Sequence, residues 1–271
     1  MREISGREIS LEIIGELKKL PVPQKSLVAF LIGEDPASES FLKRKQIVAE
    51  DLGLDFQIEK LNPDLGQAEI EEKISISVSG DSVGGVIIQL PIPESLDKDR
   101  ILRLIPAEKD IDLLSSEAKE LFRAGESKAL PPSVAVLEEI ISREKLDLPS
   151  INVAIVGLGE LVGEPISIWF SQKSRELYKI DEGDSYLPIK ECDLVITGAG
   201  KAGLIKKDHL KKGAIVIDYG YSINNGRLKG DLSEEAYEKL SAYTPTPGGT
   251  GPILVAKLFE NFYKLNDSSN E

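Results

Sequence analysis

Apolar residues recur along this chain at two spacings, one typical of amphipathic helices and one typical of buried strands. Helical spacing predicts helices over residues 7–20, 37–52, 66–78, 95–105 and 253–264. Short apolar runs predict strands over residues 27–32, 56–61, 83–90, 151–156, 175–180, 193–197 and 213–218. We expect further helices between the strands of the second half. Helices and strands that alternate in this way indicate an α/β protein with parallel sheets.

One segment breaks this pattern. The run Thr244-Pro-Thr-Pro-Gly-Gly-Thr-Gly-Pro252 contains three prolines and three glycines in nine residues. Proline and glycine at this density exclude a helix or a central strand, so the segment has to be a shaped loop. Gly-Gly inside a Pro-rich loop is typical of a place where the backbone approaches another group closely.

The composition places the chain among soluble globular proteins, with 41% hydrophobic and 29% charged residues over 271 positions. No apolar run is long enough to span a membrane, and the first residues lack the apolar centre of a signal peptide. We therefore expect no membrane partner and a cytoplasmic location. The single cysteine, Cys192, excludes an internal disulfide.

The net charge of −13 argues against nucleic acid as a partner, because a phosphate backbone requires Lys and Arg to neutralise it. The simpler interpretation is that acidity keeps the protein soluble. The chain has one histidine, His209, and one cysteine, so we expect neither a metal site nor a Cys–His nucleophile pair. Acid–base chemistry would then fall to Lys, Asp, Glu, Tyr or water.

A dinucleotide signal follows the strand over residues 151–156. The glycines Gly157, Gly159 and Gly163 give the spacing GxGxxxG between a buried strand and the start of a helix. In such a turn, glycine allows the backbone to approach a pyrophosphate, and the helix start supplies N–H groups. The alternative is an ordinary glycine-rich turn, since many strand–helix turns contain glycine.

The next predicted strand ends in Asp181-Glu182. An acidic residue about 20 positions after the glycines can accept hydrogen bonds from ribose hydroxyls and would repel a 2′-phosphate, which favours NAD over NADP. The alternative is a solvated loop, because Asp184 is acidic too. Glycines also follow two further strands, in Gly198-Ala-Gly200 and Asp218-Tyr-Gly220, where open α/β sheets bind ligands.

The candidate chemistry begins with Lys45, which shares one helix face with Phe41, Val48 and Leu52. A desolvated lysine has a lowered pKa and exchanges protons near neutrality. The alternative is a lysine that extends from the edge of the apolar stripe to water.

Polar residues at two other places add to this candidate set. Gln89 ends a buried strand before Pro91, a position where a polar residue commonly faces a cleft. Asp110 and Asp112 lie two residues apart, and we expect one of them to face a cleft and the other to face solvent. We interpret Asp110 as a surface charge.

Taken together, these motifs resemble the bifunctional methylenetetrahydrofolate dehydrogenase/methenyltetrahydrofolate cyclohydrolase family. The resemblance runs collinearly from Ile4-Ser-Gly-Arg7 to the last helix, and no single motif carries it alone. The matching segments are Gly33-Glu-Asp-Pro-Ala-Ser38 with Phe41 and Lys45, Gln89-Leu-Pro-Ile-Pro93, Lys109-Asp-Ile-Asp112, the Gly157 turn with Val162-Gly163-Glu-Pro165, Gly200-Lys201, Gly230-Asp231 and Pro245-Thr-Pro-Gly-Gly-Thr-Gly-Pro252.

The resemblance implies an activity and a domain plan. Enzymes of this family oxidise 5,10-methylene-tetrahydrofolate with NAD or NADP and hydrolyse the methenyl product to 10-formyl-tetrahydrofolate, in one-carbon metabolism that supplies purine biosynthesis. Residues 1–125 with 252–271 would form an α/β catalytic domain that binds the folate. Residues 126–251 would form a Rossmann-like NAD(P)-binding domain. The resemblance also implies a homodimer.

The resemblance further implies roles for single residues. Lys45 matches the catalytic lysine, Gln89 the glutamine that tunes it, and Asp112 the aspartate that binds the pterin ring. The implied substrate-binding residues are Phe41, Pro247, Gly248 and Gly249. The implied cofactor-binding residues are Gly157, Leu158, Gly159, Asp181, Glu182, Gly198 and Tyr221.

The chain also departs from the family pattern. Phe41 stands where the family usually has tyrosine, and Leu113 stands at the glycine that follows the pterin aspartate. The segment Ala129–Val134 replaces Pro-Cys-Thr-Pro-x-Gly, and Leu158-Gly159 replaces an Arg-Ser pair that helps to hold a 2′-phosphate. With Asp181-Glu182 at the ribose end, the last change points to NAD.

These departures leave other functions open. One is a degenerate paralogue that binds folate or nucleotide without turnover. A second is an enzyme with cyclohydrolase activity alone, and a third is an enzyme of this fold that acts on a different one-carbon pterin carrier.

Overall fold

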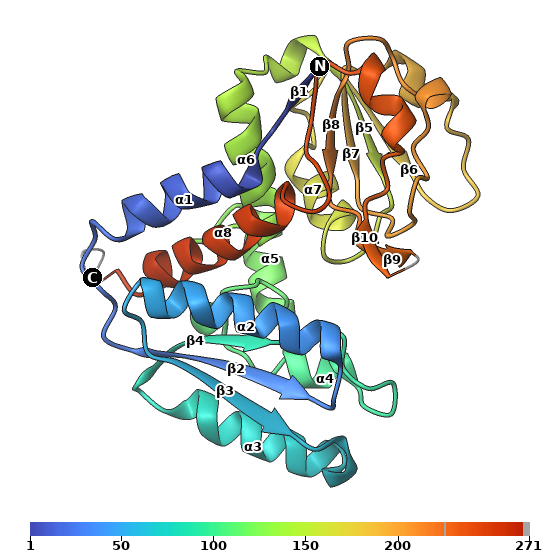
Figure 1. The fold of residues 1–271 in the computed structure, drawn as a ribbon. Coiled ribbons are helices and arrows are strands. Elements are labelled where there is room, and N and C mark those ends of the chain that lie inside the picture. The colour runs from blue at the N-terminus through green and yellow to red at the C-terminus, as the bar shows by residue number, and fades with distance from the viewer. Residues whose placement is uncertain (225, 268–271) are drawn as a thin grey trace. The chain divides into compact units, whose positions relative to one another are not determined.

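The structure, a computed structural model, describes residues 1–224 and 226–267 and contains two compact units (Figure 1). The six-stranded unit consists of Met1–Leu11 and Ser133–Leu254, and the three-stranded unit consists of Glu12–Pro132 and Val255–Glu271. Each unit has its own parallel sheet, as the alternation of helices and strands predicts. The functional division into residues 1–125 with 252–271 and 126–251 stays a prediction.

The bounds of the elements are as follows. The helices are α1 (Gly6–Leu17), α2 (Pro36–Asp51), α3 (Gln67–Ser79), α4 (Lys98–Leu102), α5 (Ser116–Ala124), α6 (Pro132–Glu144), α7 (Gly163–Trp169) and α8 (Thr250–Leu265). The strands are β1 (Arg2–Glu3), β2 (Ser26–Ile32), β3 (Phe56–Leu61), β4 (Val83–Ile88), β5 (Asn152–Val156), β6 (Glu176–Ile180), β7 (Leu194–Thr197), β8 (Ile215–Asp218), β9 (Ser222–Asn224), β10 (Arg227–Lys229) and β11 (Ala242–Tyr243).

The three-stranded sheet has the order β3-β2-β4. All seven residues of β2 are buried, because helices cover both faces of this central strand. On one face, Ile70 and Ile74 of α3 pack against the sheet. On the other face, Phe259 of α8 meets Phe56 edge to face, with ring centroids 6.5 Å apart. The loop that follows β4 carries Gln89 out of this core.

The six-stranded sheet has the order β1-β11-β8-β7-β5-β6, and every neighbouring pair is parallel. In a parallel sheet the carboxyl ends of the strands share one edge, so the loops after β5, β6, β7 and β8 come together there. A separate antiparallel hairpin, β9–β10, follows β8. The fold therefore brings the glycine-rich strand ends of the sequence to one place.

The predicted strands are confirmed, but the helices expected between the later strands are only partly so. Helix α7 follows β5, whereas the connections after β6 and β7 contain only short 3₁₀ turns, over Leu187–Glu191 and Lys207–His209. Glycine with positive φ at Gly183, Gly200 and Gly203 shapes these connections as turns instead of helices.

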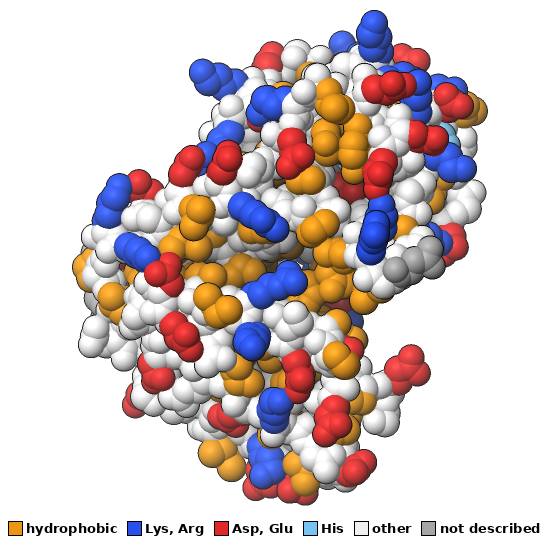
Figure 2. All heavy atoms as spheres, viewed as in Figure 1, with side chains coloured by type: hydrophobic (Ala, Val, Ile, Leu, Met, Phe, Trp, Pro, Cys, Tyr) orange, Lys and Arg blue, Asp and Glu red, His pale blue; other side chains and the backbone are white. Residues whose placement is uncertain are grey.

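Acidic and basic side chains are interspersed over the face of the molecule in Figure 2. Neither sign of charge forms a continuous field on that face, although the net charge is −13. The interpretation that acidity serves solubility stays a prediction.

Among the helices of residues 1–224 and 226–267, none combines the length and apolar character that crossing a bilayer requires.

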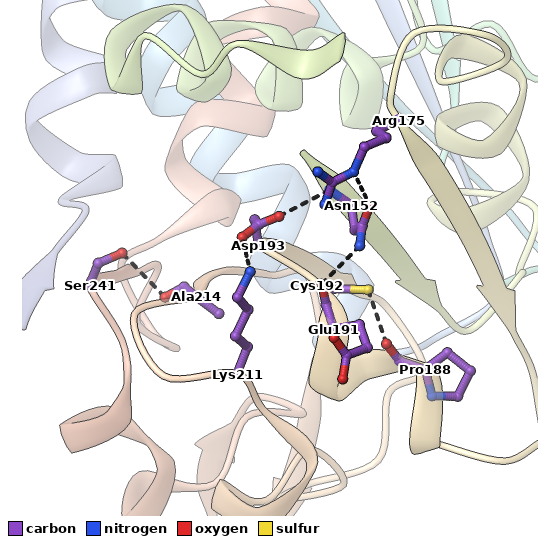
Figure 3. A network of polar contacts seen from close by, with 9 residues as sticks. All are labelled: Asn152, Arg175, Pro188, Glu191, Cys192, Asp193, Lys211, Ala214 and Ser241. Atoms are coloured by element: carbon purple, nitrogen blue, oxygen red, sulfur yellow. Dashed lines mark hydrogen bonds and ion pairs between the residues drawn. The ribbon is translucent and has the colours of Figure 1, made fainter. Parts of the chain in front are cut away.

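A polar network ties together the amino-terminal ends of β5, β6 and β7 (Figure 3). Asp193 accepts a hydrogen bond from the backbone N–H of Asn152 at 3.1 Å and pairs with Lys211. Arg175 donates from Nε to Asn152 Oδ1 at 2.9 Å. Next to this network, the buried Cys192 thiol donates to the carbonyl of Pro188 at 3.3 Å. Polar contacts therefore connect the strands at this edge of the sheet, and the Cys192 side chain lies buried beside them.

We expect the Cys192 thiol to be unreactive in the folded protein. Burial raises the pKa of Cys192 to about 12, and only the thiolate attacks a disulfide reagent. A chromogenic thiol assay at pH 8 should detect almost no free thiol in the native protein and one per chain after unfolding in guanidinium. Complete labelling of the native protein within minutes would contradict the burial of this side chain.

Candidate active site and nucleotide cavity

Helix α2 begins where the sequence predicts and places Lys45 beside the core. Asp35 caps the helix by accepting a hydrogen bond from the N–H of Ser38 at 2.7 Å, and Pro36 occupies the first turn. The fully buried side chains of α2 include Leu42 and Ala49. Lys45 lies three residues after Leu42 and four before Ala49, so its stem runs along the buried face and the side chain is half-buried.

Lys45 makes a direct contact with Gln89. The Lys45 Nζ donates to Gln89 Oε1 at 3.2 Å. Gln89 is 8% exposed, and its backbone N–H donates to Phe30 in the neighbouring strand at 2.9 Å. Its Nε2 donates to the Leu90 carbonyl at 2.8 Å, so the amide cannot turn without setting oxygen against oxygen. Gln89 therefore presents a fixed neutral acceptor to the lysine.

Asp112 supplies an opposing charge close enough to act on Lys45. Burial lowers the pKa of Lys45, and the carboxylate of Asp112 raises it in part. Burial likewise raises the pKa of Asp112, and the Lys45 ammonium lowers it. The pair thus consists of two half-buried, opposite charges, in which each partner makes the charged form of the other less costly. The structure therefore brings together the three residues predicted to be catalytic.

The interpretation of Asp110 as a surface charge is wrong. Asp110 is 1% exposed, pairs with Val86 at the edge of the sheet, and accepts a hydrogen bond from the backbone N–H of Ser115 at 2.6 Å. Burial raises the pKa of Asp110 to about 6. The sequence pattern shows only two nearby acidic residues, whereas in the fold the chain turns here and the N–H of Ser115 needs an internal acceptor.

Two departures from the family pattern have visible consequences in the three-stranded unit. Phe41 is half-buried one turn before Lys45, and the guanidinium of Arg44 lies 5.6 Å from the centre of its ring. Leu113 has φ of 55°, in the left-handed region that favours glycine, and its side chain is buried at 3% exposure. The chain thus retains a glycine-like backbone at Leu113 and adds a side chain to the core.

In the six-stranded unit, the turn after β5 is built by close backbone contacts. Gly157 has φ of 84°, and a Cβ there would lie 2.8 Å from the backbone N and Cα of Ala199. A Cβ at Gly163 would lie 1.9 Å from the carbonyl oxygen of Gly157, and one at Gly198 would lie 2.7 Å from Val162. These glycines are therefore required by packing, and they leave bare backbone at the carboxyl end of the sheet.

A cavity of about 280 Å³ opens at this edge. Six residues predicted to bind the cofactor line it: Gly157, Leu158, Gly159, Asp181, Glu182 and Gly198. Tyr221, the seventh, is not among the lining residues and is 41% exposed, so its role stays a prediction. The sequence reasoning gave no role to the other lining residues, Val156, Tyr186, Ala199, Lys201 and Leu204. Bare glycine backbone and nearby carboxylates fit the pyrophosphate and ribose of a dinucleotide.

Two of the residues that line the cavity, Glu182 and Lys201, form an ion pair. The Lys201 Nζ lies 2.6 Å from Glu182 Oε1, and this contact raises the pKa of Lys201. Asp184 does not line the cavity, but its carboxylate accepts a hydrogen bond from the N–H of Asp181 at 2.9 Å and so shapes the turn. A signal for Lys201 existed in the sequence, because it follows glycines at a strand end, where ligands bind.

The Pro-rich loop is shaped by contacts within the six-stranded unit. Gly248 has φ of 104°, and the N–H of Gly249 donates to the Pro245 carbonyl at 2.7 Å. A Cβ at Gly6, at the start of α1, would lie 1.6 Å from the Gly249 carbonyl oxygen. The prediction of a shaped loop with a close backbone approach is confirmed. The contact of Pro247, Gly248 and Gly249 with a substrate stays a prediction.

Comparison with known proteins supplies the family. The model of the tetrahydrofolate dehydrogenase/cyclohydrolase catalytic domain matches residues 4–112, and that of the NAD(P)-binding domain of the same family matches residues 131–270. The chain is 33% identical to the bifunctional protein FolD of Bacillus licheniformis, over 96% of this chain and 95% of that protein. It is 32% identical to the bifunctional protein FolD of an Exiguobacterium species, over 95% and 93%.

A solved structure agrees with these relatives. The bifunctional enzyme FolD, a methylenetetrahydrofolate dehydrogenase/cyclohydrolase from Campylobacter jejuni, superimposes with a TM-score of 0.92 at 30% identity, over 97% of each chain. Matches over both domains and nearly the whole length carry one conclusion: the chain belongs to the tetrahydrofolate dehydrogenase/cyclohydrolase family.

Proposed function

We propose that this chain oxidises 5,10-methylene-tetrahydrofolate to the 5,10-methenyl form with a nicotinamide cofactor, and hydrolyses the methenyl form to 10-formyl-tetrahydrofolate. The observation that carries the proposal is the 3.2 Å contact between Lys45 Nζ and Gln89 Oε1, half-buried beside Asp112. The glycine-lined cavity of the six-stranded unit supports the oxidation step, because it fits a dinucleotide. A homodimer and a cytoplasmic location remain part of the proposal.

Lys45 has its main role in hydrolysis. Water must add to the cationic methenyl carbon and lose a proton, and a ring nitrogen must gain a proton before its bond to that carbon breaks. A lysine whose pKa is lowered by burial exchanges protons closer to neutral pH than an ordinary lysine does. Gln89 holds the ammonium in place through a neutral oxygen, and Asp112 is proposed to bind the pterin ring.

The oxidation step depends on positioning. The lone pairs of folate atoms N5 and N10 push the hydride off the methylene carbon, so no protein acid is required. When bound, NAD supplies the ring carbon that accepts this hydride. Phe41 offers an aromatic face to the pterin, and the absence of a tyrosine hydroxyl is tolerable because the protein must only align the reactants and exclude water. Pro247, Gly248 and Gly249 are proposed to border the same substrate.

We propose that NAD is preferred over NADP. Asp181 and Glu182 line the cavity, and this supports the proposal. Their carboxylates would accept hydrogen bonds from ribose hydroxyls and would repel a 2′-phosphate. Leu158 and Gly159 offer no cation or hydroxyl to such a phosphate. Lys201 is a lining cation, but Glu182 already neutralises it.

We expect Lys45→Met to abolish hydrolysis of methenyl-tetrahydrofolate while the fold is retained. Methionine preserves the apolar stem but removes the proton-exchanging amine, and general acid–base catalysis contributes about 100-fold to 10,000-fold. Decay of methenyl absorbance measures hydrolysis, and circular dichroism checks the fold. Lys73→Met, at an exposed position on α3, is the control and should hydrolyse at the wild-type rate.

The same assay set tests the proposal as a whole. Wild-type protein with methylene-tetrahydrofolate and NAD should produce reduced cofactor. Hydrolysis without any reduced cofactor would indicate a cyclohydrolase-only enzyme, and the absence of both activities would indicate a binding protein. A Lys45→Met variant that hydrolyses normally would remove the lysine from the mechanism.

We expect Glu182→Gln to shift cofactor use towards NADP. The substitution removes a negative charge from the ribose end and releases Lys201 to pair with a 2′-phosphate, so the ratio of kcat/KM for NADP to that for NAD should rise roughly tenfold. Initial rates of methylene-tetrahydrofolate oxidation with each cofactor measure this ratio. Glu176→Gln, at the exposed first position of β6, should leave the ratio unchanged. Equal ratios in all three proteins would refute the role of Glu182.

A further inference from the structure

Asp231 is a fully buried carboxylate whose three hydrogen-bond donors belong to one short segment. Its Oδ2 accepts hydrogen bonds from Thr197 Oγ1 at 2.8 Å and from the N–H of Ala199 at 2.7 Å. Its Oδ1 accepts from the N–H of Lys201 at 2.7 Å. The end of β7 and the loop that follows are therefore gathered around a single side chain.

This loop is one wall of the nucleotide cavity. Ala199 and Lys201 both line the cavity, and Ala199 is the residue whose backbone leaves no space for a Cβ at Gly157. Asp231 thus holds the backbone of Ala199 against the glycine turn on the other wall. It also fixes the point from which the Lys201 side chain reaches Glu182.

A second buried aspartate, Asp218 at the end of β8, binds the backbone N–H of Asp231. Its Oδ1 accepts hydrogen bonds from the N–H of Gly220 at 2.7 Å and of Asp231 at 3.2 Å. Its Oδ2 accepts from the N–H of Leu232 at 2.9 Å. Asp218 is itself 2% exposed, so both carboxylates lie in the interior.

Two glycines provide the space for these carboxylates. A Cβ at Gly220 would lie 2.4 Å from Asp231 Cγ, and a Cβ at Gly230 would lie 2.1 Å from Asp218 Oδ2. Burying two neighbouring carboxylates is costly unless hydrogen bonds satisfy them, and here each receives three. Two glycines and two buried aspartates therefore fix the shape of this loop, although the loop contains none of the predicted catalytic residues.

We propose that Asp231, supported by Asp218, is a positioning residue for cofactor binding. It fixes the Gly198–Lys201 loop against the Gly157 turn and so sets the width of the cavity that receives the dinucleotide. This inference rests on the proposed function, because it takes the cavity as the cofactor site. The inference assigns Asp231 and Lys45 to different steps. Asp231 acts on binding of the cofactor, whereas the hydrolysis proposed for Lys45 requires no nicotinamide cofactor.

The variant Asp231→Asn tests the inference without changing the size of the side chain. Three donors converge on the two carboxylate oxygens, whereas asparagine has one acceptor oxygen and one NH₂ group. Its NH₂ group would therefore face at least one backbone N–H of the loop. Loss of a hydrogen bond to a charged group corresponds to a loss of about tenfold or more in affinity.

We expect Asp231→Asn to raise the Kd for NAD, measured by titration calorimetry, and the KM for NAD in methylene-tetrahydrofolate oxidation, each about tenfold or more. The rate of methenyl-tetrahydrofolate hydrolysis should stay within about twofold of wild type. Thr197→Val removes a single donor to Asp231 and should raise both constants in the same direction by a smaller factor. The control Asp208→Asn, at an exposed position of the same unit, should change neither activity.

Two results would overturn the inference. One is an unchanged Kd for NAD in Asp231→Asn, and the other is an equal loss of oxidation and hydrolysis in a folded variant, which would indicate a general structural role. If Asp231→Asn does not fold, Thr197→Val decides by the same criteria. Failure of the proposed function is recognised separately, because wild-type protein would then neither bind NAD nor turn over either folate.

Discussion

The shape of the glycine-lined cavity in the six-stranded unit depends on two segments of backbone that touch each other. Gly157 and Ala199 approach so closely that a Cβ added at Gly157 would lie 2.8 Å from backbone atoms of Ala199, and a Cβ added at Gly163 would lie 1.9 Å from the carbonyl oxygen of Gly157. The turn after β5, the start of α7 and the loop after β7 therefore form one packed group. Because side chains are excluded from these contacts, the cavity exposes bare backbone, which suits the close approach of a pyrophosphate.

The lysine site depends on a different constraint, the cost of keeping a charge out of water. Gln89 contacts Lys45 through a neutral oxygen, and the carboxylate of Asp112 offsets only part of the effect of burial on the lysine pKa. A glutamate in place of Gln89 would stabilise the ammonium and make the lysine a poor proton donor. A glutamine that is itself fixed by Phe30 and Leu90 orients the amine and leaves its proton exchangeable.

The sequence predicts these two sites unequally. The strand–glycine–helix signal at Gly157 follows from local rules, because a tight turn and a close approach admit only glycine. Lys45 on the buried face of α2 follows from helical spacing, whereas its pairing with Gln89 follows only from the family resemblance, since 44 positions separate the two residues. The burial of Asp110 and the hydrogen bonds of Asp231 could not be predicted, because both depend on which loop N–H groups the fold brings near a carboxylate. The short 3₁₀ connections after β6 and β7 were missed because glycines with positive φ are not visible as such in a hydrophobic pattern.

Buried aspartates recur in this chain as clamps for backbone N–H groups. Asp110 holds the N–H of Ser115, Asp218 those of three residues, and Asp231 those of Ala199 and Lys201. Aspartate suits this task because it is short, accepts on two oxygens and donates nothing when ionised. The clamps are costly: burial raises the pKa of Asp110 to about 6 and that of Asp218 to about 7, so the charged form is disfavoured in the fold. That cost falls in segments next to Asp112 and around the glycine-lined cavity, where the buried carboxylates fix the shape of the loops.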